Sequence, residues 1–303
     1  MPSSPTRSGL LAGIGAYLIW GVLPLYFPLL QPAGAVEIVA HRVVWSLVFC
    51  VALLAVTRTW GAFVATLRDR RTLGLLALAA ALLAVNWIVY VYGVLSDQVV
   101  DASLGYFINP LFTVALAVLV LRERVRPVQW IALGFGAAAV AVIAIGYGSV
   151  PWIALSLAAS FGSYSLLKNR VGRSVAAVPG FATETLVLAP LSLGYLLVLQ
   201  AHGTGSFSAH GTWHALALAS AGIVTAIPLL LFGSAARRLP LALVGMLQYI
   251  TPVMQFLIGV VVLHEQMPPA RWFGFALVWV ALVILTVDGL RHSRAQSLSR
   301  RAE

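Results

Sequence analysis

The stretch NPLFTVALAVLVLRE, at residues 109–123, has a counterpart in TPVMQFLIGVVVLHE at residues 251–265. In both copies a proline opens an apolar run that ends at a glutamate. A further proline and a tryptophan follow, at 127 and 130 in the first copy and at 269 and 272 in the second. All four pairs are separated by 142 residues. Agreement at one offset predicts an internal duplication, with halves at residues 7–146 and 150–288.

The composition indicates a membrane protein. The 303 residues are 61% hydrophobic and only 9% charged, and a soluble domain of this size has too much surface to hide such a sequence. Crossing a hydrocarbon core of about 30 Å takes roughly 20 helical residues. Ten runs reach that length, and we expect an all-α integral membrane protein with spans at 9–29, 36–56, 73–95, 99–121, 127–147, 150–168, 176–200, 211–235, 240–263 and 270–288.

The distribution of positive charge predicts the orientation of these spans. Loop by loop, 17 of the 19 Lys and Arg residues fall on one side. This side is expected to be cytoplasmic, together with both termini and the basic tail at 289–303. The net charge of +10 is thus a topology signal, and no nucleic-acid partner is expected.

The same charges test the duplication. Because five helices is an odd number, the second half must be inverted relative to the first, and equivalent loops must exchange charge. The loop after span 99–121 carries Arg122, Arg124 and Arg126, whereas its equivalent after span 240–263 carries only Arg271. Two inverted five-helix repeats are typical of secondary transporters with a site near the midplane.

These features resemble the drug/metabolite transporter superfamily with paired EamA-type domains. Within it, GIGAYLIWG at 13–21, HRVVWS at 41–46 and GYFINPL at 105–111 look like the RarD-type members. The resemblance covers about the whole chain, although the second half has LQYITP at 247–252 where the first has YFINP at 106–110. It implies an exporter of small organic molecules in the bacterial cytoplasmic membrane, either proton-coupled or facilitative.

Two proline motifs lie about halfway along their predicted helices, ~15 to 18 Å deep at 1.5 Å per residue. Pro110 and Pro252 each remove one backbone donor and free a carbonyl one turn earlier, which favours a kink and an exposed acceptor. Asn109 and Thr251 would then face a central cavity. The alternative is helix curvature without any ligand contact.

Arg42 lies inside a predicted span, where a charge requires a partner or a water-filled cavity. The equivalent position in the second half is Glu184. We expect the two side chains to pair across the repeat axis near the midplane. Substrate or gating contact, a structural pair and snorkelling toward the headgroups all remain open for Arg42.

Other polar and aromatic residues extend the candidate site. Asn86 and Tyr90 share a helical face, and walls of this kind suit a small amphipathic organic molecule. Taken singly, each aromatic residue is equally explained by packing or by lipid contact. The predicted substrate-binding and translocation residues are Arg42, His41, Trp45, Asn86, Tyr90, Tyr106, Asn109, Glu184, Gln248 and Thr251.

Glu123 and Glu265 are interpreted as structural. Each precedes a proline that starts the next helix, and we expect each to accept hydrogen bonds from the unpaired amides of that helix start, fastening a hairpin.

Several function classes lack their motifs. Lys168, the only lysine, has no Gly-rich loop before it, so no ATP site is expected. His264-Glu265 does not continue into a zinc motif, and aspartates paired for magnesium are missing. We therefore expect no metal, no cofactor and no enzyme. The partners are the lipid bilayer, a small organic substrate and, in a coupled mechanism, a proton. The alternative is a membrane scaffold without transport, or a channel-like protein.

Overall fold

The computed structural model describes residues 7–119, 122, 126–171, 175–239 and 241–302. Glu123, one of the two expected hairpin residues, lies outside them. The described residues form helices and connecting turns without any strand. The elements are α1 (Arg7–Tyr26), the 3₁₀ helix η1 (Phe27–Leu30), α2 (Ala35–Thr57), α3 (Trp60–Arg68), α4 (Arg70–Leu95), α5 (Val99–Leu119), α6 (Pro127–Tyr147), α7 (Trp152–Val171), α8 (Ala177–Ala201), α9 (Gly211–Arg238), α10 (Leu241–Leu247), α11 (Ile250–Leu257), the π-helical turn η2 (Ile258–Val262) and α12 (Pro269–Ala302).

Within the described residues, nine segments are long and apolar enough to cross a membrane, and the chain is a multi-pass membrane protein. The predicted span at 150–168 corresponds to α7, which is not among the nine. α7 carries four serines and Lys168, and it packs against α4 and α5. A helix that is shielded by its neighbours can hold more polar side chains than one that faces lipid.

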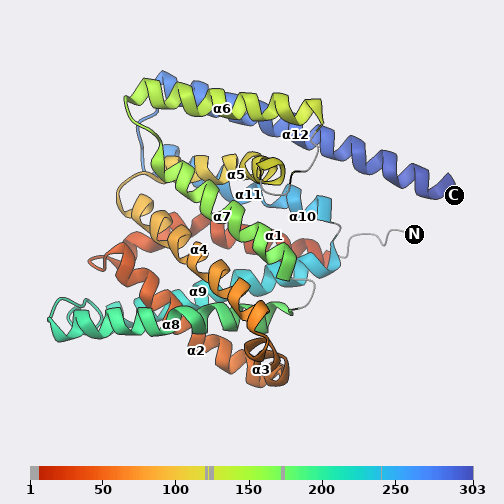
Figure 1. The fold of residues 1–303 in the computed structure, drawn as a ribbon. Helices are drawn as coiled ribbons and strands as arrows, with labels where there is room; N and C mark the ends of the chain where they lie inside the picture. Colours follow the sequence, from red (N-terminus) through yellow and green to blue (C-terminus); the bar gives the residue numbers. More distant parts are fainter. Residues whose placement is uncertain (1–6, 120–121, 123–125, 172–174, 240, 303) are drawn as a thin grey trace.

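Helices from the two halves of the sequence interlock. α1 packs on α9 and α11, while α7 packs on α4 and α5. α2 lies against α8 and α9, and α6 and α12 run side by side along one edge of the bundle (Figure 1). The largest apolar cluster, with Phe27, Ile38, Val91 and Leu157 among its members, joins η1, α2, α4 and α7. The middle of the molecule is therefore built from both halves.

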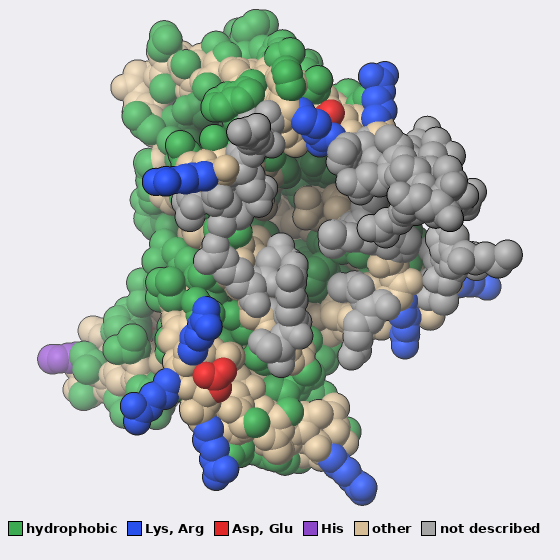
Figure 2. All heavy atoms as spheres, turned by 45° about the vertical axis from the view of Figure 1, so that its right-hand side comes forward, with side chains coloured by type: hydrophobic (Ala, Val, Ile, Leu, Met, Phe, Trp, Pro, Cys, Tyr) green, Lys and Arg blue, Asp and Glu red, His purple; other side chains and the backbone are tan. Residues whose placement is uncertain are grey.

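Basic side chains gather on one face. Figure 2 shows Lys and Arg on the side from which both chain ends emerge in Figure 1, and hydrophobic side chains over the flanks. Arg58, Arg68, Arg70, Arg71 and Arg238 are among the exposed basic residues. The segregation is the one expected for a protein whose basic face meets the cytoplasm.

Two elements differ from the expected spans. Residues 60–68, expected as part of a loop, form the short helix α3, which buries Phe63 and Thr66 while Trp60 and Val64 stay exposed. α12 continues past the predicted end at 288 to Ala302.

The predicted span at 240–263 is discontinuous. α10 ends at Leu247, and α11 begins at Ile250. Pro252 has no N–H to offer the carbonyl four residues earlier, which belongs to Gln248, and the helix is interrupted there. Pro110 lies inside α5, which remains one continuous helix. Of the two predicted proline sites, only Pro252 interrupts its helix.

Candidate functional site

Arg42 lies in the interior of the molecule. Its side chain extends from α2 and is only 4% exposed. The guanidinium carbon is 4.5 Å from the ring centre of Trp87 and 5.2 Å from that of Phe27, and Nε donates to Thr225 Oγ1 at 3.0 Å. Nη1 is buried and has no hydrogen-bond partner. Aromatic faces stabilise a desolvated cation by ~2 kcal/mol, but they leave this donor free for an acceptor.

Tyr90 and Gln255 form one wall beside Arg42. Gln255 Nε2 donates to the Tyr90 hydroxyl at 2.8 Å and to the Trp20 carbonyl at 3.2 Å. Both side chains are almost completely buried, and the Tyr90 ring lies 5.9 Å from that of Phe27, which the Arg42 guanidinium also faces. Gln255 Oε1 has no partner. An unpaired acceptor and an unpaired donor therefore share one aromatic-walled region.

Asn86 and Tyr106 continue the wall toward α7. Asn86 Nδ2 donates to Ser160 Oγ at 3.0 Å and to the Leu157 carbonyl at 3.3 Å, while Tyr106 donates to Asn86 Oδ1 at 3.2 Å. The rings of Tyr90 and Tyr106 meet edge to face at 5.7 Å. The structure thus brings together Arg42, Asn86, Tyr90 and Tyr106, four of the predicted site residues.

Asn109 and Thr251, the residues before the two prolines, differ in their surroundings. Thr251 donates from Oγ1 to the Tyr17 carbonyl at 2.9 Å, so it joins α11 to α1. Asn109 Oδ1 is buried without a partner and faces α7 at Gly162. Gln248 lies partly buried at the break between α10 and α11.

The expected pairing of Arg42 with Glu184 is wrong. Glu184 binds Lys168 of α7 instead, with Oε1 2.7 Å from Nζ. Each residue is the eighth of its helix, α2 or α8, and these helices run in opposite directions (Figure 1). At 1.5 Å per residue each side chain starts ~10 Å from its own helix start. Because those starts lie at opposite ends of the bundle, the two residues sit at different depths.

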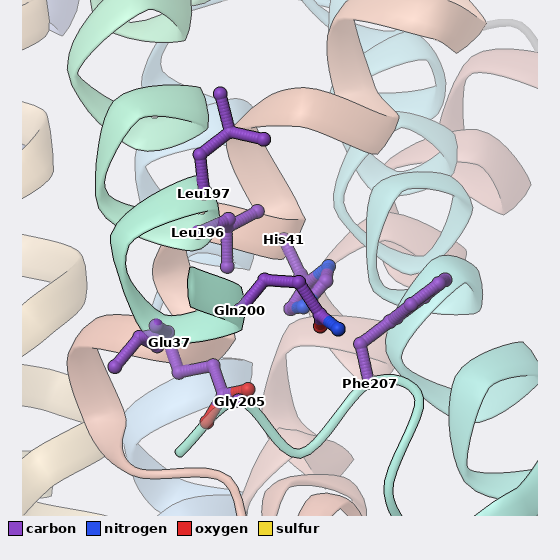
Figure 3. Close-up of a pocket in the computed structure, with 8 residues that line it drawn as sticks. Glu37, His41, Leu196, Leu197, Gln200, Gly205 and Phe207 are labelled. Carbon is purple, nitrogen blue, oxygen red and sulfur yellow. The ribbon is translucent and has the colours of Figure 1, made fainter. Parts of the chain in front are cut away.

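His41 and Trp45 face a different neighbour from Arg42, namely Phe207 in the segment between α8 and α9. The His41 ring stacks on Phe207 at 4.9 Å, and Trp45 lies 6.3 Å from the same ring. His41 lines a pocket of about 170 Å³ together with Glu37, Gln200 and Phe207 (Figure 3). Glu37 Oε1 accepts hydrogen bonds from the backbone N and Oγ of Ser206. This pocket is distinct from the region around Arg42.

The prediction that Glu265 caps the start of the following helix is wrong. Glu265 accepts hydrogen bonds from the backbone amides of Val99 and Val100, which begin α5, and not from the start of α12. Arg271, from α12, contacts both carboxylate oxygens of Asp101 in α5, at 3.2 and 3.1 Å. This end of α5 is therefore held by side chains from the second half.

Sequence reasoning missed Gln255, Thr225 and Lys168 as members of these networks. Gln255 could have been found, because it interrupts an otherwise apolar run and follows Thr251 by four residues, on the same helical face. Thr225 had no such signal, since single hydroxyl residues in membrane helices commonly bond to their own backbone, as Thr225 also does to Ala221. Among the described residues, no group of His, Cys, Asp and Glu is arranged to hold a metal ion.

Comparison with known proteins gives one family match and several similar full-length chains. The model of the EamA-like transporter family matches residues 7–145. Protein RarD of Streptomyces exfoliatus is 54% identical over 95% of this chain and 91% of its own length. The uncharacterized transporter YojE of Bacillus subtilis is 40% identical over 97% and 99%.

A more distant relative and one solved structure extend the comparison. The chloramphenicol-sensitive protein RarD of Pseudomonas aeruginosa is 31% identical over 95% of this chain and 97% of its own length. A crystal structure that is 20% identical covers 94% of this chain and 99% of its own, with a TM-score of 0.59. At that identity the likeness concerns the fold alone.

Proposed function

The chain belongs to the EamA-like transporter family of the drug/metabolite transporter superfamily, as a RarD-type member, and from this premise we propose that it exports a small amphipathic organic metabolite or drug. It is a secondary transporter of the bacterial cytoplasmic membrane, with both termini in the cytoplasm. The names of the family and of its relatives indicate a transporter rather than an enzyme.

Transport proceeds by alternating access between two inverted five-helix repeats, 7–146 and 150–288, with α7 as the sixth of ten spans. The packing supports this arrangement, because contacts between the halves occur in equivalent pairs. The contact of α1 with α9 corresponds to the contact of α7 with α4. In the same way, the contact of α1 with α11 corresponds to the contact of α7 with α5. At residue level, a side chain on Gly21 would strike Met254, and one on Gly162 would strike Phe112. Met254 and Phe112 are 142 residues apart, like the sequence repeats.

The observation that carries the proposal is the buried Arg42 with its free Nη1. A charge in this position costs about 3 kcal/mol even on mild insertion scales, and such residues usually serve a ligand or a water-filled path. Trp87, Phe27 and Tyr90 offer flat apolar surfaces, and Arg42 and Gln255 offer a donor and an acceptor. The substrate that fits is a small molecule with an aromatic or aliphatic body and an anionic or strongly accepting group.

The test has two stages. Cells with and without the protein are first compared for the metabolites they release into the medium. The compound that differs is then followed in liposomes that contain the purified protein, alongside chloramphenicol, which the name of the Pseudomonas aeruginosa relative suggests as a probe. We expect a flux that saturates with concentration and falls when Arg42 is changed to Gln.

The alternative is a membrane scaffold without transport, or a channel-like protein, in which the polar residues only pack helices. A linear flux without saturation would favour the channel, and the absence of any flux, with unchanged metabolite release, would favour the scaffold. The unpartnered donor on Arg42 argues against pure packing, because buried polar groups that only support a fold are normally hydrogen-bonded.

A further inference from the structure

Glu184 is a buried carboxylate that the Arg42 site does not use. Its side chain, on α8, is 1% exposed. Oε1 accepts a hydrogen bond from Lys168 Nζ at 2.7 Å, and Oε2 accepts one from the Tyr164 hydroxyl at 3.4 Å. Both partners come from α7, so this one carboxylate joins α7 to α8.

The two members of the ion pair differ in their access to water. The Lys168 side chain is 31% exposed and lies one turn from the end of α7, close in the chain to the start of α8. Glu184 lies deeper, ~10 Å along α8 from that start at 1.5 Å per residue. A lysine at this position can move its ammonium group to the interface when it loses its partner. The pair can therefore open without leaving a cation stranded in the interior.

Few other groups act on this carboxyl. Lys168 and Tyr164 are the ionisable side chains that face it from α7. Of the other helices that pack against α8, α2 carries Cys50, whose thiol shares a hydrogen bond with the neighbouring Thr185. Among the described residues, α3, α4 and α9 present no ionisable group to it. The charge state of Glu184 thus depends on Lys168, on the hydrogen bond from Tyr164 and on the proton.

A chain of rings leads from this pair to the Arg42 site. The Tyr164 ring lies 5.9 Å from that of Phe161, and Phe161 lies 5.9 Å from Tyr106. Tyr106 donates to Asn86 and touches Tyr90. α7 also packs directly on α4 and α5, which carry these residues. A displacement of α7 relative to α8 would therefore move a wall of the proposed substrate site.

We propose that Glu184 is the proton-binding site that couples transport to a proton gradient, with Lys168 as its internal counterion. This inference rests on the proposed transport function and names its coupling group. One proton from water adds to the carboxylate and converts it to a carboxylic acid, so the charge of the pair changes from zero to plus one. Lys168 then moves toward the interface and α7 separates from α8. Release of the proton on the other side of the membrane restores the pair.

The first test measures proton binding and needs no substrate. Infrared difference spectra of the purified protein in lipid are recorded during a pH titration, and the carbonyl band of a protonated carboxyl is followed. We expect one titrating band to disappear in Glu184→Gln and to return, shifted, in Glu184→Asp. Glu37→Gln, the same change at another buried glutamate, should leave that band in place. A spectrum of Glu184→Gln that matches the wild type would overturn the proposal.

The second test compares two modes of flux in the same liposomes with chloramphenicol as the probe. A gradient of one pH unit, worth 1.36 kcal/mol, can support about a tenfold accumulation of a neutral solute exchanged for one proton. We expect the wild type to accumulate the probe in this way. We expect Glu184→Gln to exchange it at equilibrium with no response to the gradient.

Each other outcome has a definite meaning. Accumulation that persists in Glu184→Gln, or a wild type that exchanges the probe but ignores the gradient, would overturn the coupling role. If Glu184→Gln is inactive in both modes, restored coupling in Glu184→Asp supports the proposal and its failure there overturns it. A wild type that transports no compound would contradict the proposed function, while the infrared titration still decides whether Glu184 binds the proton.

Discussion

At the residue scale, Arg42 combines burial, aromatic contacts and one free donor. The hydrogen bond to Thr225 and the two ring contacts leave Nη1 without a partner. Lysine carries the same charge but lacks the planar fork that binds carboxylates and similar anions through two hydrogen bonds. Replacing Arg42 with Lys therefore keeps the positive charge and removes the planar fork, so the contributions of charge and geometry to binding can be measured separately.

We predict that Arg42→Lys weakens anionic ligands more than neutral ones. Benzenesulfonate and benzenesulfonamide, which differ in charge but share a ring, are compared as competitors of chloramphenicol flux. The loss of one charge-assisted hydrogen bond, about 1.5 kcal/mol, should raise the inhibitory concentration of benzenesulfonate about tenfold. The value for benzenesulfonamide should change little. Arg58→Lys, at the exposed end of α2, is the matched control. Equal effects on both competitors would contradict an anion-binding role for Arg42.

At the element scale, the start of α5 depends on the second half of the chain. Glu265 caps Val99 and Val100, and Gly259 allows the close approach, since a side chain there would strike Val100. The free amides at a helix start need such acceptors. A hairpin fastened within the second half would not link the halves, whereas this contact does.

We predict that Glu265→Ala lowers the stability of the protein by about 1 to 2 kcal/mol, the usual effect of losing a helix cap. Glu265→Gln keeps one acceptor and should lose less. Thermal unfolding in detergent measures the stability of Glu265→Ala and Glu265→Gln. Glu37→Ala, which removes the acceptor of the Ser206 hydrogen bonds, serves as the comparison. An unchanged midpoint for Glu265→Ala would mean that water replaces the carboxylate at no cost.

The pH dependence of this cap has a definite sign. Burial raises the pKa of Glu265 above its ordinary value of 4.5, while the amides of Val100 and Val99 and the charge of Arg271 oppose the shift. The native state therefore holds the proton more tightly than the unfolded chain, and stability falls as pH rises from the ordinary pKa through the raised one. Relative to Glu265→Gln, the wild type should be more stable at the acid end of this range. A constant difference between the two unfolding curves would refute the shift.

At the scale of the whole molecule, the proposed inverted repeat places the two halves in the membrane in opposite senses. We predict that a reporter active only in the cytoplasm is active when fused after Arg126 and silent when fused after Met267. The two fusion points lie in equivalent loops of the proposed repeats, so inversion places them on opposite sides. Equal activity from both fusions would exclude the inverted arrangement.

The sequence by itself determined the class of molecule and its family. Composition, the spacing of apolar runs and the distribution of arginines are properties of the chain in order, and the bilayer acts on each segment directly. The membrane class and the RarD-type family prediction are confirmed. A distortion was predicted at both Pro110 and Pro252, because proline removes a backbone donor, but only the helix at Pro252 is interrupted.

Only the tertiary structure decided which side chains meet. Arg42 and Glu184 are separated by the repeat offset of 142 residues, yet they lie at different depths of antiparallel helices, so Thr225 and Lys168 become their partners. Glu265 reaches α5 instead of the neighbouring α12, and Gln255 reaches Tyr90 across the bundle. These contacts depend on how far each helix is displaced and rotated against the others. That geometry is set by the packing of all the helices together, and it leaves no trace in the local pattern of any one of them.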